Sequence, residues 1–159
     1  MTVESLGRDP AGTLQNRPYV LQEIERQLKR YRRRHHPFSL VRVDIHNLDW
    51  FEDTFGRQAG SSVLGYAADF IRRHVREVDV WYLCARDTYI IIMDETDAQA
   101  ARTLAERLAA EGRRTAFAFG SDRVTLEMSC RSATCPDDGV EAEALLRAVG
   151  FPSAAAAPA

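Results

Sequence analysis

The sequence contains little of several features that would place it in a specialised class of protein. Its three cysteines, Cys84, Cys130 and Cys135, form no CxxC pair. An odd number of unpatterned cysteines is typical of a reducing compartment, so we expect a cytoplasmic protein. No apolar run approaches the roughly 18 residues that a bilayer span needs, and the N-terminus lacks the apolar segment of a secretory signal. We therefore expect no direct membrane insertion.

The charge of the chain is also nearly balanced, with a formal net charge of -2. This balance argues against a protein that binds nucleic acid electrostatically. What the chain does have is 45% hydrophobic and 28% charged residues over 159 positions, which predicts one domain with a packed core. We divide it into a lead-in at 1–8, one domain at 9–150 and a disordered Ala/Pro tail at 151–159.

The hydrophobic periodicity predicts helices alternating with strands. The expected helices are 14–35, 47–55, 59–75, 97–111 (closed by Gly112) and 140–149. The expected strands are 38–45, a hairpin of 78–83 and 88–93, and a pair at 115–119 and 124–130 around a Gly-Ser-Asp turn. This order favours an α/β (α+β) fold in which helices pack on a sheet.

Six short segments then occur in a telling order and spacing. They are Asp9–Arg17, Val43–Gly60, Ala85–Tyr89, Leu104–Leu108, Val124–Ser129 and Asp137–Arg147. Together they resemble the GGDEF domain of the diguanylate cyclase family. The resemblance implies a mostly antiparallel central sheet flanked by helices, similar to the palm of nucleotidyl cyclases. It also implies an ancestral reaction in which two GTP molecules are condensed to cyclic di-GMP by a dimer with metal-binding carboxylates.

The residues that would face GTP depart from this pattern. The GGDEF signature is replaced by Ala85, Arg86, Asp87, Thr88 and Tyr89. The two metal-binding carboxylates fall at Asp44 and Asp87, but the second aspartate of the early metal segment is His46. The guanine-reading positions are Glu52 and Ser61, and the family's lysine is Asp49. We therefore expect a degenerate, catalytically inactive domain with no required cofactor and no metal site. Mg²⁺ would matter only if some nucleotide binding remained at Asp44 and Asp87.

The family's inhibitory RxxD motif is intact at Arg76 and Asp79, and Arg107 matches a further arginine of the same site. An arginine fork can grip a phosphate or the acceptor edge of guanine, and a carboxylate can accept from guanine N–H groups. The resemblance thus predicts a cyclic di-GMP receptor. The plainer reading is a solvated ion pair three residues apart, with Arg107 as an ordinary exposed helix residue.

Two further readings stay open. The domain can be a scaffold that binds a protein without nucleotide, or an enzyme with altered nucleotide chemistry. For the receptor we expect a partner that is either an effector protein or a second copy of the chain. Trp50 and Phe51 fit either a packed core or an exposed aromatic patch for such a partner.

Overall fold

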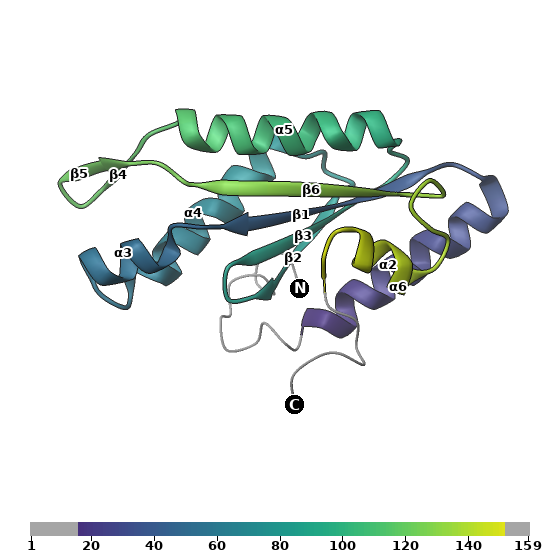
Figure 1. Cartoon of the computed structure of the whole chain (residues 1–159), viewed down its shortest axis with the longest axis horizontal. Helices are drawn as coiled ribbons and strands as arrows, with labels where there is room; N and C mark the ends of the chain where they lie inside the picture. Colours follow the sequence, from purple (N-terminus) through teal and green to yellow (C-terminus); the bar gives the residue numbers. More distant parts are fainter. Residues whose placement is uncertain (1–15, 152–159) are drawn as a thin grey trace.

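The structure is a computed structural model that describes residues 16–151. Figure 1 shows its elements around one central sheet. The helices are α2 (Asn16–Arg34), α3 (Leu48–Phe55), α4 (Ala59–His74), α5 (Ala98–Arg114) and α6 (Ala142–Ala148). The strands are β1 (Phe38–Ile45), β2 (Val80–Ala85), β3 (Thr88–Met93), β4 (Phe117–Phe119), β5 (Asp122–Val124) and β6 (Met128–Cys135).

The central sheet has four strands in the order β2-β3-β1-β6, and each neighbouring pair is antiparallel. Strands β4 and β5 form a separate two-stranded hairpin. The buried residues fall into two clusters, one containing α4 and α5 and the other containing α2 and α6. The sheet therefore lies between two helical layers, which confirms the predicted antiparallel sheet flanked by helices.

The sequence of β1 explains why both faces of the sheet are covered. Val41, Val43 and Ile45 belong to the cluster on the α4 and α5 side, whereas Phe38 and Leu40 belong to the cluster on the α2 and α6 side. A strand buried on both faces shows a nearly continuous apolar run instead of a clean alternation.

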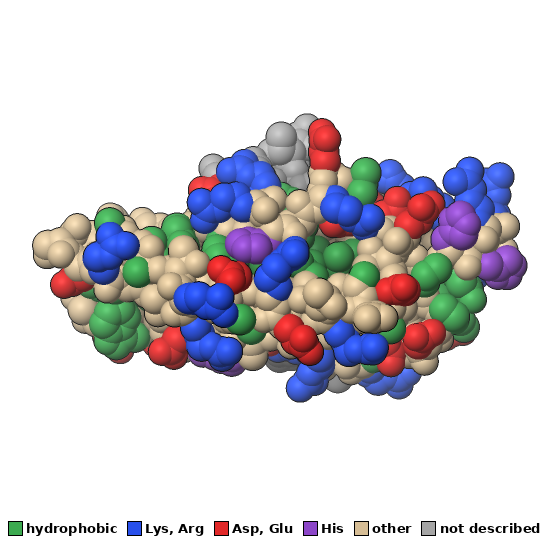
Figure 2. Space-filling model, turned by 90° about the horizontal axis from the view of Figure 1, so that it is seen from above, with side chains coloured by type: hydrophobic (Ala, Val, Ile, Leu, Met, Phe, Trp, Pro, Cys, Tyr) green, Lys and Arg blue, Asp and Glu red, His purple; other side chains and the backbone are tan. Residues whose placement is uncertain are grey.

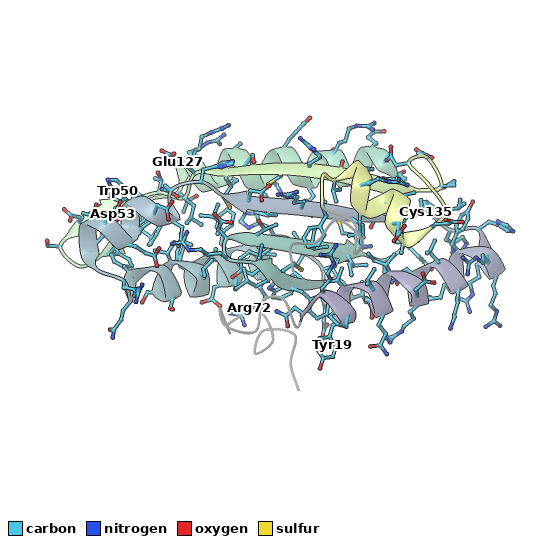
Figure 3. The ribbon with its side chains drawn as sticks, turned by 60° about the horizontal axis from the view of Figure 1, so that its bottom comes forward. Tyr19, Trp50, Asp53, Arg72, Glu127 and Cys135 are labelled. Carbon is cyan, nitrogen blue, oxygen red and sulfur yellow. The ribbon has the colours of Figure 1, made fainter. Side chains whose placement is uncertain are left out.

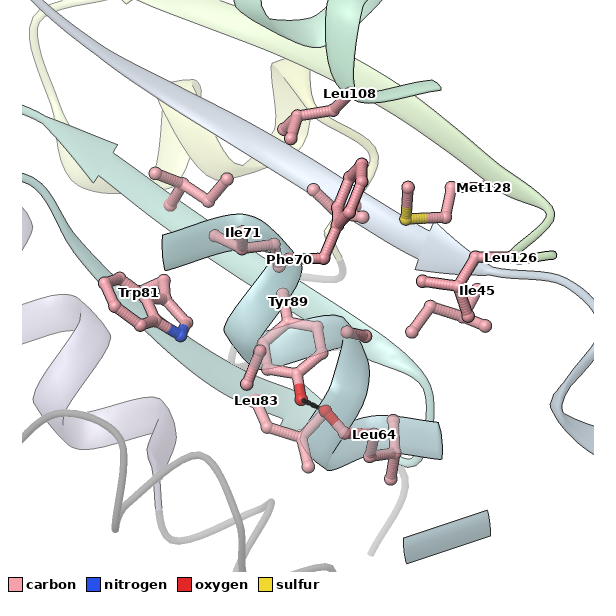
Figure 4. Close-up of a cluster of buried hydrophobic side chains, with 14 of the residues drawn as sticks. Ile45, Leu64, Phe70, Ile71, Trp81, Leu83, Tyr89, Leu108, Leu126 and Met128 are labelled. Atoms are coloured by element: carbon pink, nitrogen blue, oxygen red, sulfur yellow. Dashed lines mark hydrogen bonds between the residues drawn. The ribbon is translucent and has the colours of Figure 1, made fainter. Parts of the chain in front are cut away.

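The hairpin of β2 and β3 is fixed to α4 by a buried tyrosine. Tyr89 is fully buried, and its hydroxyl donates to the Leu64 carbonyl oxygen at 2.8 Å (Figure 4). Arg86 and Asp87 form the turn between these strands, and neither has a positive φ. The turn needs no glycine for its backbone geometry, because only a positive φ would favour that residue.

The predicted strand at 124–130 is wrong. Strand β5 ends at Val124 and pairs with β4, while β6 begins at Met128 and pairs with β1. Asn47 explains the break: its Nδ2 donates to the Thr125 carbonyl oxygen at 2.9 Å, and its Oδ1 accepts from Glu127 N–H at 3.1 Å. A side chain thus satisfies backbone groups that a ladder would otherwise use.

Two predicted boundaries also need correction. Helix α5 does not end at Gly112 but continues to Arg114. Gly112 is buried against Met128, where a Cβ would overlap the methionine side chain, so its small size serves packing. Phe151, which we placed in the tail, is buried among α2 and α6 residues. Positions 1–15, which include the predicted lead-in, and 152–159 lie outside the described residues. In the described range no helix is long and apolar enough to span a membrane.

Candidate functional site

The predicted ligand residues come together in one hollow. Arg76 and Asp79 lie between α4 and β2, and Arg107 lies on α5. All three line a cavity of about 570 Å³, within the usual size range of small-molecule sites. The rest of its wall comes from His74, Val75, Met93, Glu95, Thr96, Asp97, Gln99, Ala100, Thr103 and Leu104.

Arg76 and Asp79 form a closed turn at the edge of this hollow. The Asp79 carboxylate accepts from Arg76 N–H at 2.9 Å and from Arg76 Nη2 at 3.0 Å, and Asp79 N–H donates to the Arg76 carbonyl oxygen at 3.0 Å. The Asp79 side chain is 0% exposed, whereas that of Arg76 is 52% exposed. In this conformation Asp79 orients the arginine, and Arg76 is the group of the pair that faces solvent.

Arg76 also donates to two groups that the sequence did not predict, the Thr96 hydroxyl and the Asp94 carbonyl oxygen. Its Nη2 donates to Thr96 Oγ1 at 2.8 Å and to the Asp94 carbonyl oxygen. Both residues lie just before α5, where Asp97 caps the helix by accepting from Ala100 N–H at 2.9 Å. The polar run from Asp94 to Asp97 was the available signal. It indicated a helix start but not a contact with Arg76.

Arg107 reaches the hollow from the neighbouring helix. Its Nη2 donates to the His74 carbonyl oxygen at 2.9 Å, which fixes the side chain across the end of α4. Within residues 16–151, no hydrogen bond is made by Nη1 of Arg76 or by Nε and Nη1 of Arg107. Two arginines from different elements therefore present donor groups to the hollow, a pattern suited to an anion.

At the far end of the hairpin from Arg76, the β2–β3 turn is held by ion pairs of Arg86 with two acidic residues of α3. Arg86 Nη1 lies 2.7 Å from Asp49 Oδ1, and Arg86 Nη2 forms an ion pair with Glu52. Glu52 in turn lies against Gly60, where a Cβ would overlap its carboxylate. Asp49 and Glu52, both on α3, are thus partners of the same arginine in the β2–β3 turn.

The two carboxylates considered as metal ligands are also engaged. Asp44 Oδ2 lies 2.9 Å from Arg42 Nε, and Asp44 Oδ1 accepts from Thr88 Oγ1 at 2.7 Å. Thr88 Oγ1 also lies 3.5 Å from Asp87 Oδ1. A hard divalent cation prefers several free oxygen ligands, whereas here a guanidinium already neutralises Asp44. Asp44 would therefore have to leave its Arg42 partner in order to bind a cation. In the described range no group of three or more His, Cys, Asp or Glu side chains lies close enough to hold a metal ion.

Of the two neighbouring aromatic residues, Phe51 belongs to the packed core and Trp50 is exposed. Phe51 is fully buried, whereas Trp50 is 48% exposed. Figure 3 shows Trp50 beside Glu127 at the end of the molecule formed by α3 and the β4–β5 hairpin. Trp50 and Glu127 line a second hollow, of about 500 Å³. The other residues of its wall are His46, Asn47, Arg123, Val124 and Thr125.

The surface seen from the α5 side mixes charges of both signs. Figure 2 shows Lys and Arg side chains interspersed with Asp and Glu, with basic and histidine side chains gathered at the right-hand end. That end is where α2 finishes with Arg32, Arg33 and Arg34. Basic residues at a helix C-terminus complement the helix dipole, which is sufficient reason for their position.

The thiols are perturbed by burial. Burial raises the pKa of the Cys84 thiol to about 12, and burial together with the charge of Asp44 raises the pKa of Cys130 to about 12. Burial also raises the pKa of Cys135. A thiol must ionise to act as a nucleophile or metal ligand. We therefore assign these three cysteines no role as a nucleophile or a metal ligand.

Comparison with known proteins agrees with the resemblance read from the sequence. A family model for the diguanylate cyclase GGDEF domain matches residues 7–150. The chain is 28% identical over 134 residues to the diguanylate cyclase DgcP of Pseudomonas aeruginosa, covering 84% of this chain and 20% of that one. The fold is similar to the GGDEF domain of TpbB (YfiN) from Pseudomonas aeruginosa, with a TM-score of 0.76, 20% identity, and coverage of 84% and 78% of the two chains.

A further solved structure of the same fold is the GGDEF domain of DgcB from Caulobacter crescentus in complex with cyclic di-GMP. It matches with a TM-score of 0.66 and 20% identity, covering 75% of this chain and 72% of that one. The chain spans 20% of the length of DgcP and 30% of that of PleD from Caulobacter vibrioides, another curated relative it matches. With the family model covering almost its whole length, the chain belongs to the GGDEF domain family of diguanylate cyclases.

Proposed function

We propose that this chain is a catalytically inactive GGDEF domain that binds cyclic di-GMP through Arg76 and Arg107. In this role Asp79 holds Arg76 in place, and binding passes information to an effector protein or to a second copy. The domain acts as a receptor for the family's product and no longer makes it.

One observation carries the most weight. Arg76 and Asp79 lie in the turn between α4 and β2, and Arg107 lies on α5, yet all three line one hollow of about 570 Å³. The two arginines keep donor groups that no partner among residues 16–151 occupies. DgcB, a GGDEF domain of the same fold, is solved with cyclic di-GMP, which supports this ligand over other phosphates.

The chemistry of the ligand fits these walls. Cyclic di-GMP carries two phosphodiester anions and two guanines with acceptor edges. A guanidinium can bind a phosphate bidentately or match the O6 and N7 acceptors of guanine. Glu95 and Asp97 also line the hollow, and Asp97 is already used as the α5 cap. Their charges disfavour an anion that is not gripped directly by arginine, so the phosphate belongs near Arg76 and Arg107.

Loss of cyclase activity is supported by the contacts around the turn. Arg86 occupies the second glycine position and is held by Asp49 and Glu52. By the family resemblance these three positions would admit and read GTP, whereas here the side chains of Asp49 and Glu52 both bind that of Arg86. Asp44 is neutralised by Arg42, which disfavours a metal ion there. The side chain of Arg86 also occupies the place where the resemblance puts the triphosphate.

Calorimetric titration of cyclic di-GMP into the purified chain tests the receptor role. We expect binding at tens of micromolar ligand or below. Arg76→Ala and Arg107→Ala should each weaken binding by at least about tenfold, because each removes a charged donor from the phosphate.

Arg114→Ala is the matched control, since Arg114 is an exposed arginine of the same helix that does not line the hollow. It should bind as the unmodified chain does. Absence of binding at tens of micromolar, or equal binding by Arg76→Ala, would show that the domain is instead a scaffold without nucleotide.

A further inference from the structure

The outer edge of β6 carries backbone groups that have no partner among residues 16–151. Residue Thr134 donates its N–H to Asp138 Oδ2 at 2.8 Å and accepts Asp138 N–H at 2.7 Å, so its peptide groups point away from β1. At the other end, His46 N–H donates to the Glu127 carbonyl oxygen at 2.7 Å, so Glu127 points toward β1. Peptide directions alternate along a strand. Cys130 and Ser132 therefore point outward, as Thr134 does.

Asp138 covers only one end of this edge. The outward N–H and C=O groups of Cys130 and Ser132 make no hydrogen bond with any residue in the range 16–151. Figure 1 shows β6 as the last strand of the sheet, with α5 running beside it. An uncovered edge of this kind is a template for one more strand.

A groove of about 360 Å³ runs along the same edge. Cys130 and Ser132 form one wall. The other wall comes from one flank of α5, at Arg102, Ala105, Glu106, Ala109 and Arg113. The small side chains at its centre leave room for a polypeptide backbone beside β6.

The charges of the groove indicate what occupies it. Arg102 and Arg113 are exposed and lie near its ends, and neither forms an ion pair within the described part of the chain. They are 11 residues apart on a helix, or roughly 16 Å, which a strand spans in about five residues. Side chains on one face of a strand are separated by an even number of residues, so carboxylates four residues apart come nearest. A second copy of the chain would bring arginine against arginine along antiparallel α5 helices.

We propose that the β6 edge binds an extended segment of a partner protein that carries acidic residues about four positions apart. The segment pairs with Cys130 and Ser132 through its backbone, and its carboxylates pair with Arg102 and Arg113. The groove uses one flank of α5, and Arg107 of the nucleotide hollow lies on the other flank. This interaction surface is therefore separate from the proposed receptor site.

Labelled eight-residue peptides with glutamate at the second and sixth positions and valine or threonine between them are the probe. A matched set carries lysine at those two positions. Fluorescence anisotropy should show that the acidic set binds at least about tenfold more tightly than the lysine set. The double variant Arg102→Glu with Arg113→Glu should reverse this order, while Arg114→Glu should leave it unchanged.

Ser132→Pro tests the backbone pairing. It removes an N–H that has no partner in the described fold, and proline is tolerated on edge strands. We expect the variant to melt cooperatively and to bind the acidic peptides at least about tenfold more weakly. Equal binding by both peptide sets, or an unchanged preference in the double arginine variant, would overturn the inference. A homodimer that Ser132→Pro dissociates in sedimentation would likewise show that the edge joins two copies instead.

Discussion

At the scale of single residues, the pair formed by Arg76 and Asp79 joins stability to recognition. Asp79 is the buried partner, and its carboxylate receives the backbone and side-chain donors of Arg76. A buried carboxylate that loses its charge leaves those donors weakly satisfied. The pair is thus a structural turn, and its exposed guanidinium is the group that the proposed ligand would contact.

Asp79→Asn should therefore lower both stability and ligand affinity. The amide keeps the shape but turns an NH₂ group toward the Arg76 donors, and we expect a loss of about 1–3 kcal/mol in the free energy of unfolding. Urea denaturation measures it. Glu111→Gln, which alters an exposed pair with Arg114, should change that free energy by less than about 0.5 kcal/mol. Equal effects of the two substitutions would show that the Asp79 carboxylate is not structural.

The thiols give a residue-scale prediction for pH. The pKa of Cys84 and Cys130 rises from 9.0 to about 12 in the folded protein, so the unfolded chain loses these protons first. Their contribution to stability is complete below pH 9 and is lost as the pH rises toward 12. Urea denaturation at several pH values between 8 and 11 should show this decline, and replacing both residues with alanine should make it shallower. A slope unaffected by the replacements would contradict the burial effect.

At the scale of elements, the β2–β3 hairpin shows what its own backbone requires. Its turn has no positive φ at Arg86 or Asp87, and Tyr89 anchors it to α4. The alanine and arginine are therefore compatible with the hairpin. The glycines of the family pattern are explained by the close approach of a substrate.

Restoring Ala85→Gly and Arg86→Gly should not create a cyclase. Asp49, Glu52 and the Arg42-neutralised Asp44 remain, so the triphosphate still lacks its binding groups. We expect no cyclic di-GMP when the variant is incubated with GTP and Mg²⁺ and the products are separated by chromatography. We also expect a loss of stability of about 1 kcal/mol from the added backbone freedom. Product formation would show that the turn alone had blocked the reaction.

Elements with strong periodicity were predictable from sequence, and those fixed by distant side chains were not. The buried run of β1 and the hairpin could be placed to within a few residues. The break at 125–127 depends on Asn47, which is 78 residues from Thr125 in sequence. Likewise, Gly112 is an ordinary helix terminator in sequence, and only its close contact with Met128 shows that the glycine serves packing inside α5.

At the scale of the whole molecule, α5 separates two hollows. One flank faces Arg76 across the proposed nucleotide site, and the other faces the free edge of β6. The family register singled out Arg76, Asp79 and Arg107, which the fold places in one hollow, but the contacts of Arg76 with Asp94 and Thr96 required the fold. In the sequence, Asp49 and Glu52 gave no sign that both would contact Arg86. Their pairing follows from the way α3 and the hairpin meet.

The central claim is that the product site remains while the substrate site has closed. Parallel calorimetric titrations of one protein sample with cyclic di-GMP and with GTP plus Mg²⁺ test it most directly. The account predicts saturable heat with cyclic di-GMP at tens of micromolar or below, and none with GTP over the same range. Saturable binding of GTP, or its absence for cyclic di-GMP, would contradict it.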